Sequence, residues 1–596
     1  MRNSQPAQYL LIDLSRSQSE LREIPPEVTG DYPYGTALAT WLLHTHLPEG
    51  TECFSPQAPI VLAPGMFSGL PFPGATTMAV VTRSPLTGLW AGGVMGGEFA
   101  WALARTGWSA VVVQGRAPQS CFLLLDEGRA FFRKASRIEG CSSSRARDEL
   151  KREWGGGAAV LCVGPAGEAQ IRYASLSDGS PSPGLRGGLG AVFGSKNLKA
   201  VVLRSHRSLS IKHPTDFLEQ VGPVMKSLGA IQKTQGSVDV LEEMERADAL
   251  PGRNFQEIFS DNGWIEKIRK LPYRKRACIG CPISCLKSVA VESEDNGRTV
   301  PTELALFPEH LWAAGPLVGL TSPEDTARIL IRCRELGLDP VSYGGVAAWA
   351  AEAQEKGIAL GLDFRSEVGF GQVDWLVNLP DMIVTNPEVS DFLGQGVRAA
   401  AQRIGGVAID LAAHYEGLEL TYADPRRHYQ PLSFLGPAFS VPSGRDMGSE
   451  ANDELEVDGV ISEEDKWALW QTLGICPWAA MSQVNLEHIL PGLLHSVDGR
   501  DITRETLVAW SRDLTNLIKT FDWRNDWRPF DQNLSAKFFQ QELSSADRVF
   551  TALDREQRRD RMSRYFSQRG WGKDGRPIPE SHLVQPSRLL CFGSRT

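Results

Sequence analysis

The sequence predicts an α+β fold in which a β-rich N-terminal domain is followed by two mainly α-helical domains. In the first third of the chain, short apolar runs alternate with Gly and Pro clusters, which is typical of strands joined by turns. These runs are 58–63, 78–82, 110–114 and 200–203. Beyond Ser205 helical signals dominate, so we expect domains at residues 1–205, 206–405 and 406–596.

Two helices of the second part are predicted with both of their ends. Ser322, followed by Pro-Glu-Asp, is a typical N-cap, and Gly337 is placed to end that helix. Ser462, followed by acidic residues, is expected to cap a second helix, which Gly474 should end just before Cys476. A helix end is a suitable place for a metal ligand.

Composition excludes several classes of function. With 596 residues, 42% of them hydrophobic and 22% charged, the chain is typical of a globular protein. Its net charge of −9 argues against nucleic acid as the main partner, because phosphate binding needs a basic surface. No uncharged apolar stretch reaches the roughly 18 to 20 residues that span a bilayer. The N-terminus alternates like a pair of strands and has no secretion signal, so we expect a cytoplasmic protein with no membrane contact.

A run of cysteines carries the strongest chemical signal. Cys278, Cys281 and Cys285 lie in one short segment, and Cys476 follows nearly two hundred residues later. Three closely spaced thiolates and a distant fourth can face one soft metal centre, which predicts a [4Fe-4S] cluster. Structural zinc is the alternative, although it usually takes two Cys-x-x-Cys pairs and Cys476 has no cysteine neighbour. Disulfides are less favoured, since ten cysteines are few for a chain that can build large cores.

A short basic run, Tyr273-Arg-Lys-Arg276, directly precedes these cysteines. It can be a solvated loop, or it can be a docking patch for an acidic electron carrier.

Glycine-rich turns give a second, weaker signal. They contain Gly92-Gly93, Gly96-Gly97 and a run from Gly184 to Gly190. Glycine permits close approach of the backbone to a bulky ligand, and successive N–H groups can bind phosphates. Neither run matches the Rossmann fingerprint or the P-loop, so ordinary tight turns remain an alternative.

The amino-acid sequence of these and other segments resembles that of the aldehyde:ferredoxin oxidoreductase family over essentially the whole chain. The matching segments are Pro33-Tyr-Gly35, Ala63-Pro-Gly65, Val81-Thr-Arg-Ser-Pro-Leu-Thr-Gly88, Val163-Gly-Pro-Ala-Gly-Glu168, the run from Gly187 to Ala200, the three clustered cysteines, Glu335-Leu-Gly-Leu-Asp339, Gly417-Leu-Glu-Leu420, Asp424-Pro-Arg426, Leu473-Gly-Ile-Cys476 and Arg569-Gly-Trp-Gly-Lys-Asp-Gly575.

The resemblance implies the architecture and chemistry of that family. Its enzymes bind a tungsten or molybdenum ion between two molybdopterin dithiolenes, with a [4Fe-4S] cluster beside one pterin, and in some members magnesium bridges the pterin phosphates. They oxidise aldehydes to carboxylic acids and reduce ferredoxin. The N-terminal domain forms a base for the pterins, and the two helical domains cover them. Ferredoxin or a ferredoxin-like electron-transfer subunit is therefore the expected partner, a small aldehyde the expected substrate, and a homodimer a possible assembly.

Carried over residue by residue, the resemblance assigns a set of site residues. It makes Cys278, Cys281, Cys285 and Cys476 the cluster ligands. It assigns pterin or magnesium contacts to Val94, Gly96, Gly184, Gly337, Leu338, Asp339, Gly474 and Ile475. Glu303 aligns with a glutamate near the metal, and we expect it to be partly buried with a raised pKa, so that it shuttles protons. His414 is the expected histidine of the active site.

Several positions depart from the family pattern. Thr77 stands where an arginine clamps a pterin phosphate, the segment 180–183 lacks a second such arginine, and Val94 replaces an asparagine near the magnesium. Arg334 and Gln471 replace the aspartate or asparagine that accepts hydrogen bonds from the pterin ring, and arginine has donors only.

The segment that normally carries an active-site histidine also differs. It reads Ser443-Gly-Arg-Asp-Met-Gly448, in which Arg445 or Asp446 is placed to fill the histidine's volume. His310 and His428 are further candidates beside His414, and an insertion of about six residues around 307–310 is expected to change the substrate pocket.

These departures leave three functional hypotheses. The first is aldehyde oxidation at a tungsten or molybdenum bispterin centre. The second is a low-potential reductase that uses the same centre on another substrate, such as an aromatic acid derivative. The third is a non-catalytic, cluster-binding electron-transfer or structural subunit.

Overall fold

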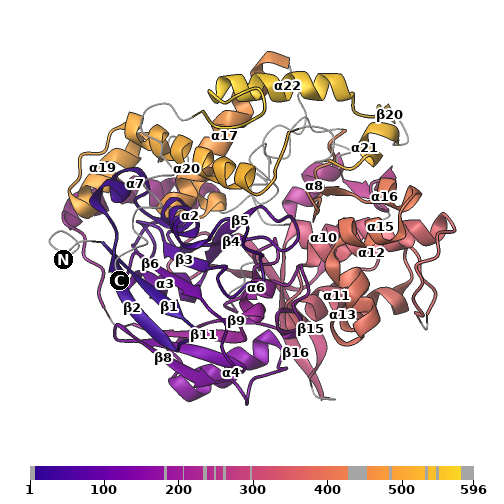
Figure 1. Ribbon diagram of the computed structural model, residues 1–596, viewed down its shortest axis with the longest axis horizontal. Coiled ribbons are helices and arrows are strands. Elements are labelled where there is room, and N and C mark those ends of the chain that lie inside the picture. The colour runs from indigo at the N-terminus through magenta and orange to yellow at the C-terminus, as the bar shows by residue number, and fades with distance from the viewer. Residues whose placement is uncertain are drawn as a thin grey trace.

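Two β-sheets form the base of the computed structural model (Figure 1). The model describes residues 7–179, 184–205, 207–231, 238–246, 250–259, 263–295, 298–364, 366–426, 453–481, 486–529, 534–544 and 549–578.

The first sheet has six strands in the order β2-β1-β6-β3-β4-β5. They are β1 (Gln8–Asp13), β2 (Gln18–Glu23), β3 (Ile60–Pro64), β4 (Thr77–Arg83), β5 (Trp90–Gly96) and β6 (Ala110–Gln114). Only β1 and β6 run parallel; the other neighbours are antiparallel. The N-terminal strand pair and the strands expected near residues 60, 80 and 112 are thereby confirmed.

The second sheet has five strands in the order β10-β9-β11-β7-β8. They are β7 (Cys121–Asp126), β8 (Arg129–Lys134), β9 (Ala159–Val163), β10 (Leu176–Ser177) and β11 (Leu198–Arg204). The two sheets share one core, in which Leu62 and Val80 of the first pack with Leu161 and Val201 of the second. Because side chains alternate along a strand, the next residues along, such as Val61 in β3, face the other way.

Helices cover the outer faces of both sheets. The N-terminal helices are α1 (Pro26–Asp31), α2 (Gly35–His46), α3 (Glu98–Ala104), α4 (Ser143–Trp154), α5 (Pro165–Glu168) and α6 (Leu189–Ser195). The outer face of the second sheet packs on α4 through Ala146 and Leu150. The outer face of the first sheet packs on α2 and on helices from the C-terminal part of the chain.

The middle of the chain is mostly helical. Its helices are α7 (Pro214–Ile231), α8 (Asp239–Arg246), α9 (Trp264–Lys270), α10 (Pro308–Ala313), η1 (Pro316–Val318), α11 (Pro323–Leu336), α12 (Pro340–Glu355), α13 (Val373–Thr385), α14 (Pro387–Phe392), η2 (Leu393–Gln395), α15 (Val397–Ile404) and α16 (Val407–Leu411). As predicted, Ser322 caps α11 by accepting a hydrogen bond from the Asp325 N–H at 3.2 Å. Gly337 follows α11 with φ +76°, also as predicted.

The same region contains a three-stranded meander that the sequence analysis missed. It consists of β14 (Tyr273–Arg276), β15 (Leu286–Asp295) and β16 (Arg298–Leu306), in that order. The cysteine run lies in the connection between β14 and β15. The short strands β12 (Pro251–Gly252) and β13 (Glu257–Ile258) belong to a separate small sheet.

The C-terminal part supplies a hairpin and the helices above the first sheet (Figure 1). Its elements are β17 (His414–Tyr415), β18 (Leu418–Glu419), α17 (Asp453–Leu473), α18 (Pro477–Met481), α19 (Leu486–Asp498), α20 (Arg504–Arg524), α21 (Lys537–Gln540), β19 (Leu543–Ser544), β20 (Val549–Phe550) and α22 (Arg555–Gln568). The strands β19 and β20 join β12 and β13, so the end of the chain returns to its middle part.

The expectation that Ser462 begins a helix is wrong, because Ser462 lies inside α17. Val457, Val460 and Ile461 precede it and pack on the core beside the first sheet, which keeps the chain helical through the serine. The model therefore has a β-rich base followed by mainly helical domains, and the division at residues 205 and 405 stays a prediction. Among the described residues, no helix is both long and apolar enough to cross a membrane.

Candidate functional site

Two helix ends of the same geometry meet the sheet base. Gly337 follows α11 and Gly474 follows α17, each with φ +76°. In both cases the residue after the glycine donates a backbone hydrogen bond to the last turn of the helix. The Leu338 N–H donates to the Cys333 carbonyl at 2.8 Å, and the Ile475 N–H donates to the Trp470 carbonyl at 2.9 Å. This is the Schellman arrangement, whose left-handed residue favours glycine.

The end of α11 rests on the second sheet. A Cβ atom on Gly164, which directly follows β9, would lie 2.3 Å from the carbonyl oxygen of Leu336. The Ser175 N–H donates to the Gly337 carbonyl at 2.8 Å, and the Asp339 N–H donates to the Tyr173 carbonyl at 3.0 Å. Only glycine permits this approach of the two backbones.

The end of α17 rests on the first sheet in the same manner. A Cβ atom on Gly65, which directly follows β3, would lie 2.1 Å from the backbone nitrogen of Gly474. The Phe67 N–H donates to the Leu473 carbonyl, and the Cys476 N–H to the Gly74 carbonyl, both at 2.9 Å. Each sheet thus presents one glycine-lined helix end, which suits two copies of one bulky ligand.

Strand β5 carries two of the predicted cofactor contacts, Val94 and Gly96. It is the edge strand of the first sheet, and its residues Gly92, Gly93 and Val94 are only half-buried. A Cβ atom on Gly93 would lie 3.0 Å from the Leu185 side chain, toward the α11 end. At the other end of the strand, Gly96 is paired with Thr77. Val94 and Gly96 thus lie on an edge strand, and their contact with a cofactor stays a prediction.

Two buried hydroxyls near the α17 end have no hydrogen-bond partner among the described residues. They belong to Thr77 and Thr472. Ser68 lies between them, since its hydroxyl donates to the Thr77 carbonyl at 2.5 Å and would lie 2.4 Å from a Cβ atom on Gly474. Buried polar atoms are usually satisfied, so these hydroxyls are suited to bind a polar ligand.

The four predicted cluster cysteines lie together beside the α17 end. Burial raises the pKa of the Cys278 thiol, and the charges of Cys476, Cys285 and Cys281 raise it further. Burial, with the charges of Cys476 and Cys281, raises the pKa of Cys285 to about 12, and burial, with the charge of Cys281, raises that of Cys476 to about 11. Burial raises the pKa of Cys281 as well. Four half-buried thiols that repel one another as thiolates need bound cations to ionise, which is the chemistry of a soft metal centre.

The separation of these thiols bears on the kind of metal centre. No three His, Cys, Asp or Glu side chains in the described part of the chain are close enough together to bind one ion. A single zinc ion needs four thiolates at about 2.3 Å. The preference for an iron–sulfur cluster over zinc therefore rests on the spacing of the cysteines in the sequence.

Asp339 at the α11 end is held by an arginine that the sequence analysis did not single out. Arg186 donates to the Asp339 carboxylate at 2.9 Å and to the Glu419 carbonyl at 2.8 Å. Asp339 also caps α12 through the N–H groups of Val341 and Ser342. Burial opposes ionisation, but Arg186 and Ser342 hold the pKa of Asp339 below its usual value. The carboxylate thus fixes this helix end instead of pointing freely at a ligand. Gly184, shortly before Arg186, closely approaches Ser175.

Two buried carboxyls beside Asp339 and Arg186 were missed from the sequence. They belong to Glu309 in α10 and Glu419 in β18, and one oxygen of each has no hydrogen-bond partner among the described residues. Burial raises the pKa of both, although Arg186 opposes the shift. Burial lowers the pKa of the adjacent His310 to about 4, so its ring is neutral. The apolar residues around Glu309 were the available signal for a buried helix.

The expected partial burial and raised pKa of Glu303 are wrong, and its role near the metal stays a prediction. Its side chain is exposed, and it forms an ion pair with Arg276 at 2.5 Å, with 44% of each side chain accessible. The Ser288 hydroxyl donates to the same carboxylate at 2.5 Å. Hydrogen bonds from Arg276 and Ser288 lower the pKa of Glu303, whereas the sequence led us to expect a raised pKa. The cause is its place on the outer face of β16, opposite the exposed Ala290.

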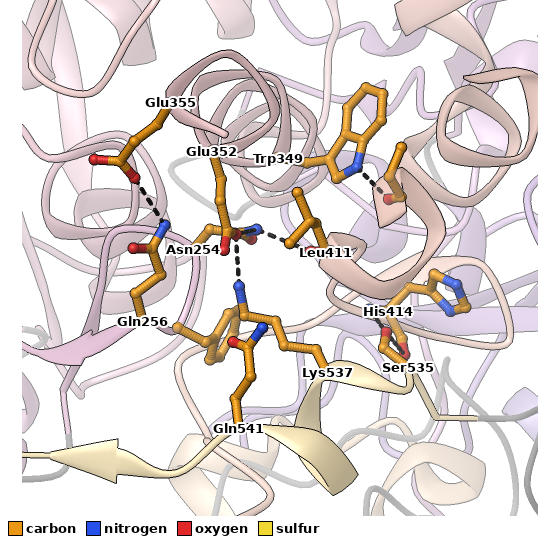
Figure 2. A network of polar contacts seen from close by, with 12 residues as sticks. Asn254, Gln256, Trp349, Glu352, Glu355, Leu411, His414, Ser535, Lys537 and Gln541 are labelled. Carbon is orange, nitrogen blue, oxygen red and sulfur yellow. Dashed lines mark hydrogen bonds and ion pairs between the residues drawn. The ribbon is translucent and has the colours of Figure 1, made fainter. Parts of the chain in front are cut away.

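His414 is buried in β17 and held by its backbone (Figure 2). Its N–H donates to the Ser535 hydroxyl at 2.7 Å, and that hydroxyl donates to the His414 carbonyl at 3.0 Å. The Gly417 N–H donates to Nδ1 of the ring at 3.4 Å. Burial and Arg398 lower the pKa of His414 to about 3, so the ring is neutral. This environment fits a structural histidine, and its catalytic role stays a prediction.

The two unusual residues of the helix-end motifs have partners of their own. Arg334 donates to the Glu303 carbonyl, which directs it toward the meander. The Gln471 carboxamide accepts from the Thr36 hydroxyl at 3.4 Å. His428, residues 180–183 and residues 443–448 lie outside the described residues.

The site thus combines a two-sheet base, two matching glycine helix ends and four cysteines beside one of them. The family model for aldehyde ferredoxin oxidoreductase, N-terminal domain, matches residues 9–205, and that for domains 2 and 3 matches residues 219–583. The chain belongs to the aldehyde ferredoxin oxidoreductase family.

Known members are distant in sequence. The tungsten-containing aldehyde ferredoxin oxidoreductase of Pyrococcus abyssi is 26% identical over 89% of this chain and 90% of its own. A Pyrococcus furiosus protein named aliphatic sulfonate oxidoreductase, WOR-like subunit, is 23% identical over 96% of this chain and 95% of its own. Among solved structures, the active site complex BamBC of benzoyl coenzyme A reductase superposes with a TM-score of 0.81 at 22% identity. It covers 96% of this chain and 95% of that chain, which shows the shared fold.

Proposed function

We propose that this protein is a tungsten- or molybdenum-bispterin oxidoreductase that oxidises an aldehyde to a carboxylic acid and passes the electrons through a [4Fe-4S] cluster to ferredoxin. The observation that carries the proposal is the pair of matching helix ends, at Gly337 and Gly474, each of which is held by a different sheet. Four cysteines lie at only one of them, as a cluster beside one of two pterins requires. The names of the relatives, which include a tungsten enzyme, support the same choice.

Each group has residues suited to hold it. Gly337, Leu338 and Asp339 would contact one pterin, and Gly474 and Ile475 the other, with Val94, Gly96 and Gly184 on the side of the base. The free hydroxyls of Thr77 and Thr472 would donate to the second ligand in place of the absent arginine. A magnesium ion between the pterin phosphates would lie near Val94, where a backbone carbonyl is the available ligand.

The chain's own residues account for the protons of the reaction. An aldehyde and water give a carboxylate, two electrons and three protons, and the bound metal supplies the two-electron chemistry. Glu309 is the residue placed to accept a proton from the attacking water, because its carboxyl is buried, has a raised pKa and has one free oxygen. The neutral His310 beside it can donate a hydrogen bond to the substrate oxygen.

A reductase is the second candidate. Residues 307–310 differ from the family pattern and supply Glu309 and His310 to the site, so the substrate pocket has its own chemistry. A buried carboxyl whose pKa burial raises can deliver a proton to a substrate as readily as it accepts one. The third hypothesis, a non-catalytic subunit, predicts iron without tungsten or molybdenum.

Metal analysis of the purified protein, followed by turnover in both directions, tests the proposal. We expect about four irons and one tungsten or molybdenum per chain, and reduction of a viologen dye by aldehydes. Reaction only with reduced dye and an aromatic acid derivative would establish the reductase instead. Four irons with neither heavy metal would show that the protein is not this enzyme.

Two carboxyl variants test the proton-transfer residue. Glu309→Gln keeps the shape of the side chain but cannot take up a proton, and we expect turnover to fall by about 10²- to 10⁴-fold with the metal content unchanged. Glu303→Gln is the matched comparison, since it removes an exposed carboxylate at the position that sequence alignment favoured. A large loss in Glu303→Gln with normal turnover in Glu309→Gln would refute the assignment.

A further inference from the structure

A charged, exposed strand borders the cysteine loop. Strand β14 is the edge strand of its three-stranded sheet, and all four of its residues are exposed. The chain enters the cysteine run only two residues after β14 ends, so this strand and the loop form one continuous surface.

The charges of this surface are unbalanced. Residues 264–280 contain six Lys or Arg and one Glu, in a chain whose net charge is −9. Arg269, Lys270 and Arg276 are neutralised by ion pairs with glutamates. Within the part of the chain that the structure describes, Arg274 and Lys275 have no acidic partner. A positive patch on an acidic protein selects the orientation of an acidic partner.

The cysteine loop itself supplies an apolar contact. Ile279, between Cys278 and Cys281, is 38% exposed, and Tyr273 at the start of β14 is also 38% exposed. Gly280 has no neighbour within 4 Å of where a Cβ atom would lie, so nothing in the described protein covers the loop. An exposed Tyr and Ile bordered by unpaired cations are typical of a small, transient protein interface.

We propose that β14 and the loop 277–280 form the docking surface for a small acidic iron–sulfur carrier protein. This inference rests on the proposed role of the four cysteines as cluster ligands. One electron passes from the reduced cluster to the oxidised cluster of the carrier, so the protein is oxidised and the carrier reduced. Two carriers in turn remove the two electrons of one aldehyde.

A simpler explanation exists for the basic side chains alone. Lysine and arginine on an edge strand also prevent it from pairing with other strands. Glutamate would prevent strand pairing equally well, but it would not attract an acidic carrier. Charge reversal therefore separates the two explanations.

The test uses the double variant Arg274→Glu/Lys275→Glu and a purified acidic ferredoxin with two [4Fe-4S] clusters as the probe. We expect its dissociation constant to rise about ten-fold or more at low salt, and the wild-type affinity to fall as ionic strength rises. Turnover with a small viologen dye should stay unchanged. The matched control is Arg129→Glu/Lys134→Glu on β8, an exposed basic edge strand of the second sheet, which should bind as wild type does.

Each possible result either supports or overturns the proposed docking surface. Equal ferredoxin binding by wild type and Arg274→Glu/Lys275→Glu, or an equal loss in the β8 control, would overturn the docking surface. Retained ferredoxin binding with loss of binding to phosphatidylserine vesicles or to RNA would overturn it in favour of another anionic partner. Iron content and dye turnover of the same samples report on the proposed enzyme separately, so its failure is distinguishable from failure of docking.

Discussion

Replacing Gly474 by alanine should disturb both the stability of the protein and its metal site. Gly474 has φ +76°, and an added Cβ atom would lie 2.4 Å from the Ser68 hydroxyl and 2.9 Å from the Gly65 Cα. A left-handed conformation costs an L-residue about 1–2 kcal/mol. Relief of the overlap by a backbone shift adds about 1–3 kcal/mol. We therefore expect Gly474→Ala to lose about 2–5 kcal/mol of unfolding free energy.

A matched control isolates the effect of the close approach. Gly357 ends α12 in the same way, with φ +73°, but has no neighbour within 4 Å of where its Cβ atom would lie. Gly357→Ala should therefore lose only the conformational part, about 1–2 kcal/mol.

The two variants are compared by urea unfolding and by iron content. Because Gly474 lies two residues before Cys476, its variant should also lose iron, whereas Gly357→Ala should keep it. Equal losses of stability, with full iron content in both, would refute the idea that the α17 end is seated directly on Gly65.

Three further predictions concern the thiol cluster and two buried charge networks. Cys476→Ser should lower the iron content or make the cluster labile, and Cys141→Ser, a change of a cysteine outside the four, should leave iron unchanged; equal iron in both variants would exclude Cys476 as a ligand. Burial raises the pKa of Glu416 to about 7 despite Arg398 and Lys519, so this carboxyl stabilises the fold at low pH and that contribution is lost as pH rises through about 7. In thermal unfolding, the unfolding free energy of Glu416→Gln minus that of wild type should therefore rise by about 1–3 kcal/mol between pH 5 and pH 8. A difference that stays constant with pH would contradict the raised pKa of Glu416. Lys537 and Asn254 both donate to the buried Glu352 carboxylate (Figure 2). Lys537→Met should cost about 3–5 kcal/mol by leaving that charge unpaired, and Glu352→Leu/Lys537→Met should cost clearly less; a double-mutant cycle with purely additive losses would show that the pair is not coupled.

The Glu352 network explains how the end of the chain is tied to its middle part. Glu352 lies in α12, Asn254 between β12 and β13, and Lys537 in α21, so three segments far apart in sequence meet at one carboxylate. Asp424 and Arg426 form a second fully buried ion pair, and the Arg426 guanidinium donates to the Phe255 carbonyl at 2.6 Å. These pairs fix the position of the hairpin that carries His414 and Glu419.

Local patterns in the sequence were sufficient for several strands of the base and for one helix. Alternating or continuous β-branched runs predicted β3, β4, β6 and β11, because a strand must present apolar side chains at a period of two. Ser322 and Gly337 predicted both ends of α11, because capping is decided by the side chain and conformation of a single residue. The same capping argument gave the wrong helix start at Ser462, because burial of the preceding residues outweighs a favourable N-cap.

The sequence by itself determined the cysteine motif, the glycine positions and the family, because these depend on residue type and order. Only the tertiary structure decided the surroundings of each acidic side chain. Glu303 and Glu309 are six residues apart, yet one lies on the outer face of β16 against Arg276, and the other lies inside α10 beside Arg186. The pKa of a carboxyl depends on its burial and on the charges that distant segments bring to it, and neither is encoded in its sequence neighbours. The same holds for the seating of Gly337 on Gly164 and of Gly474 on Gly65, which the packing of helices on sheets alone brings together.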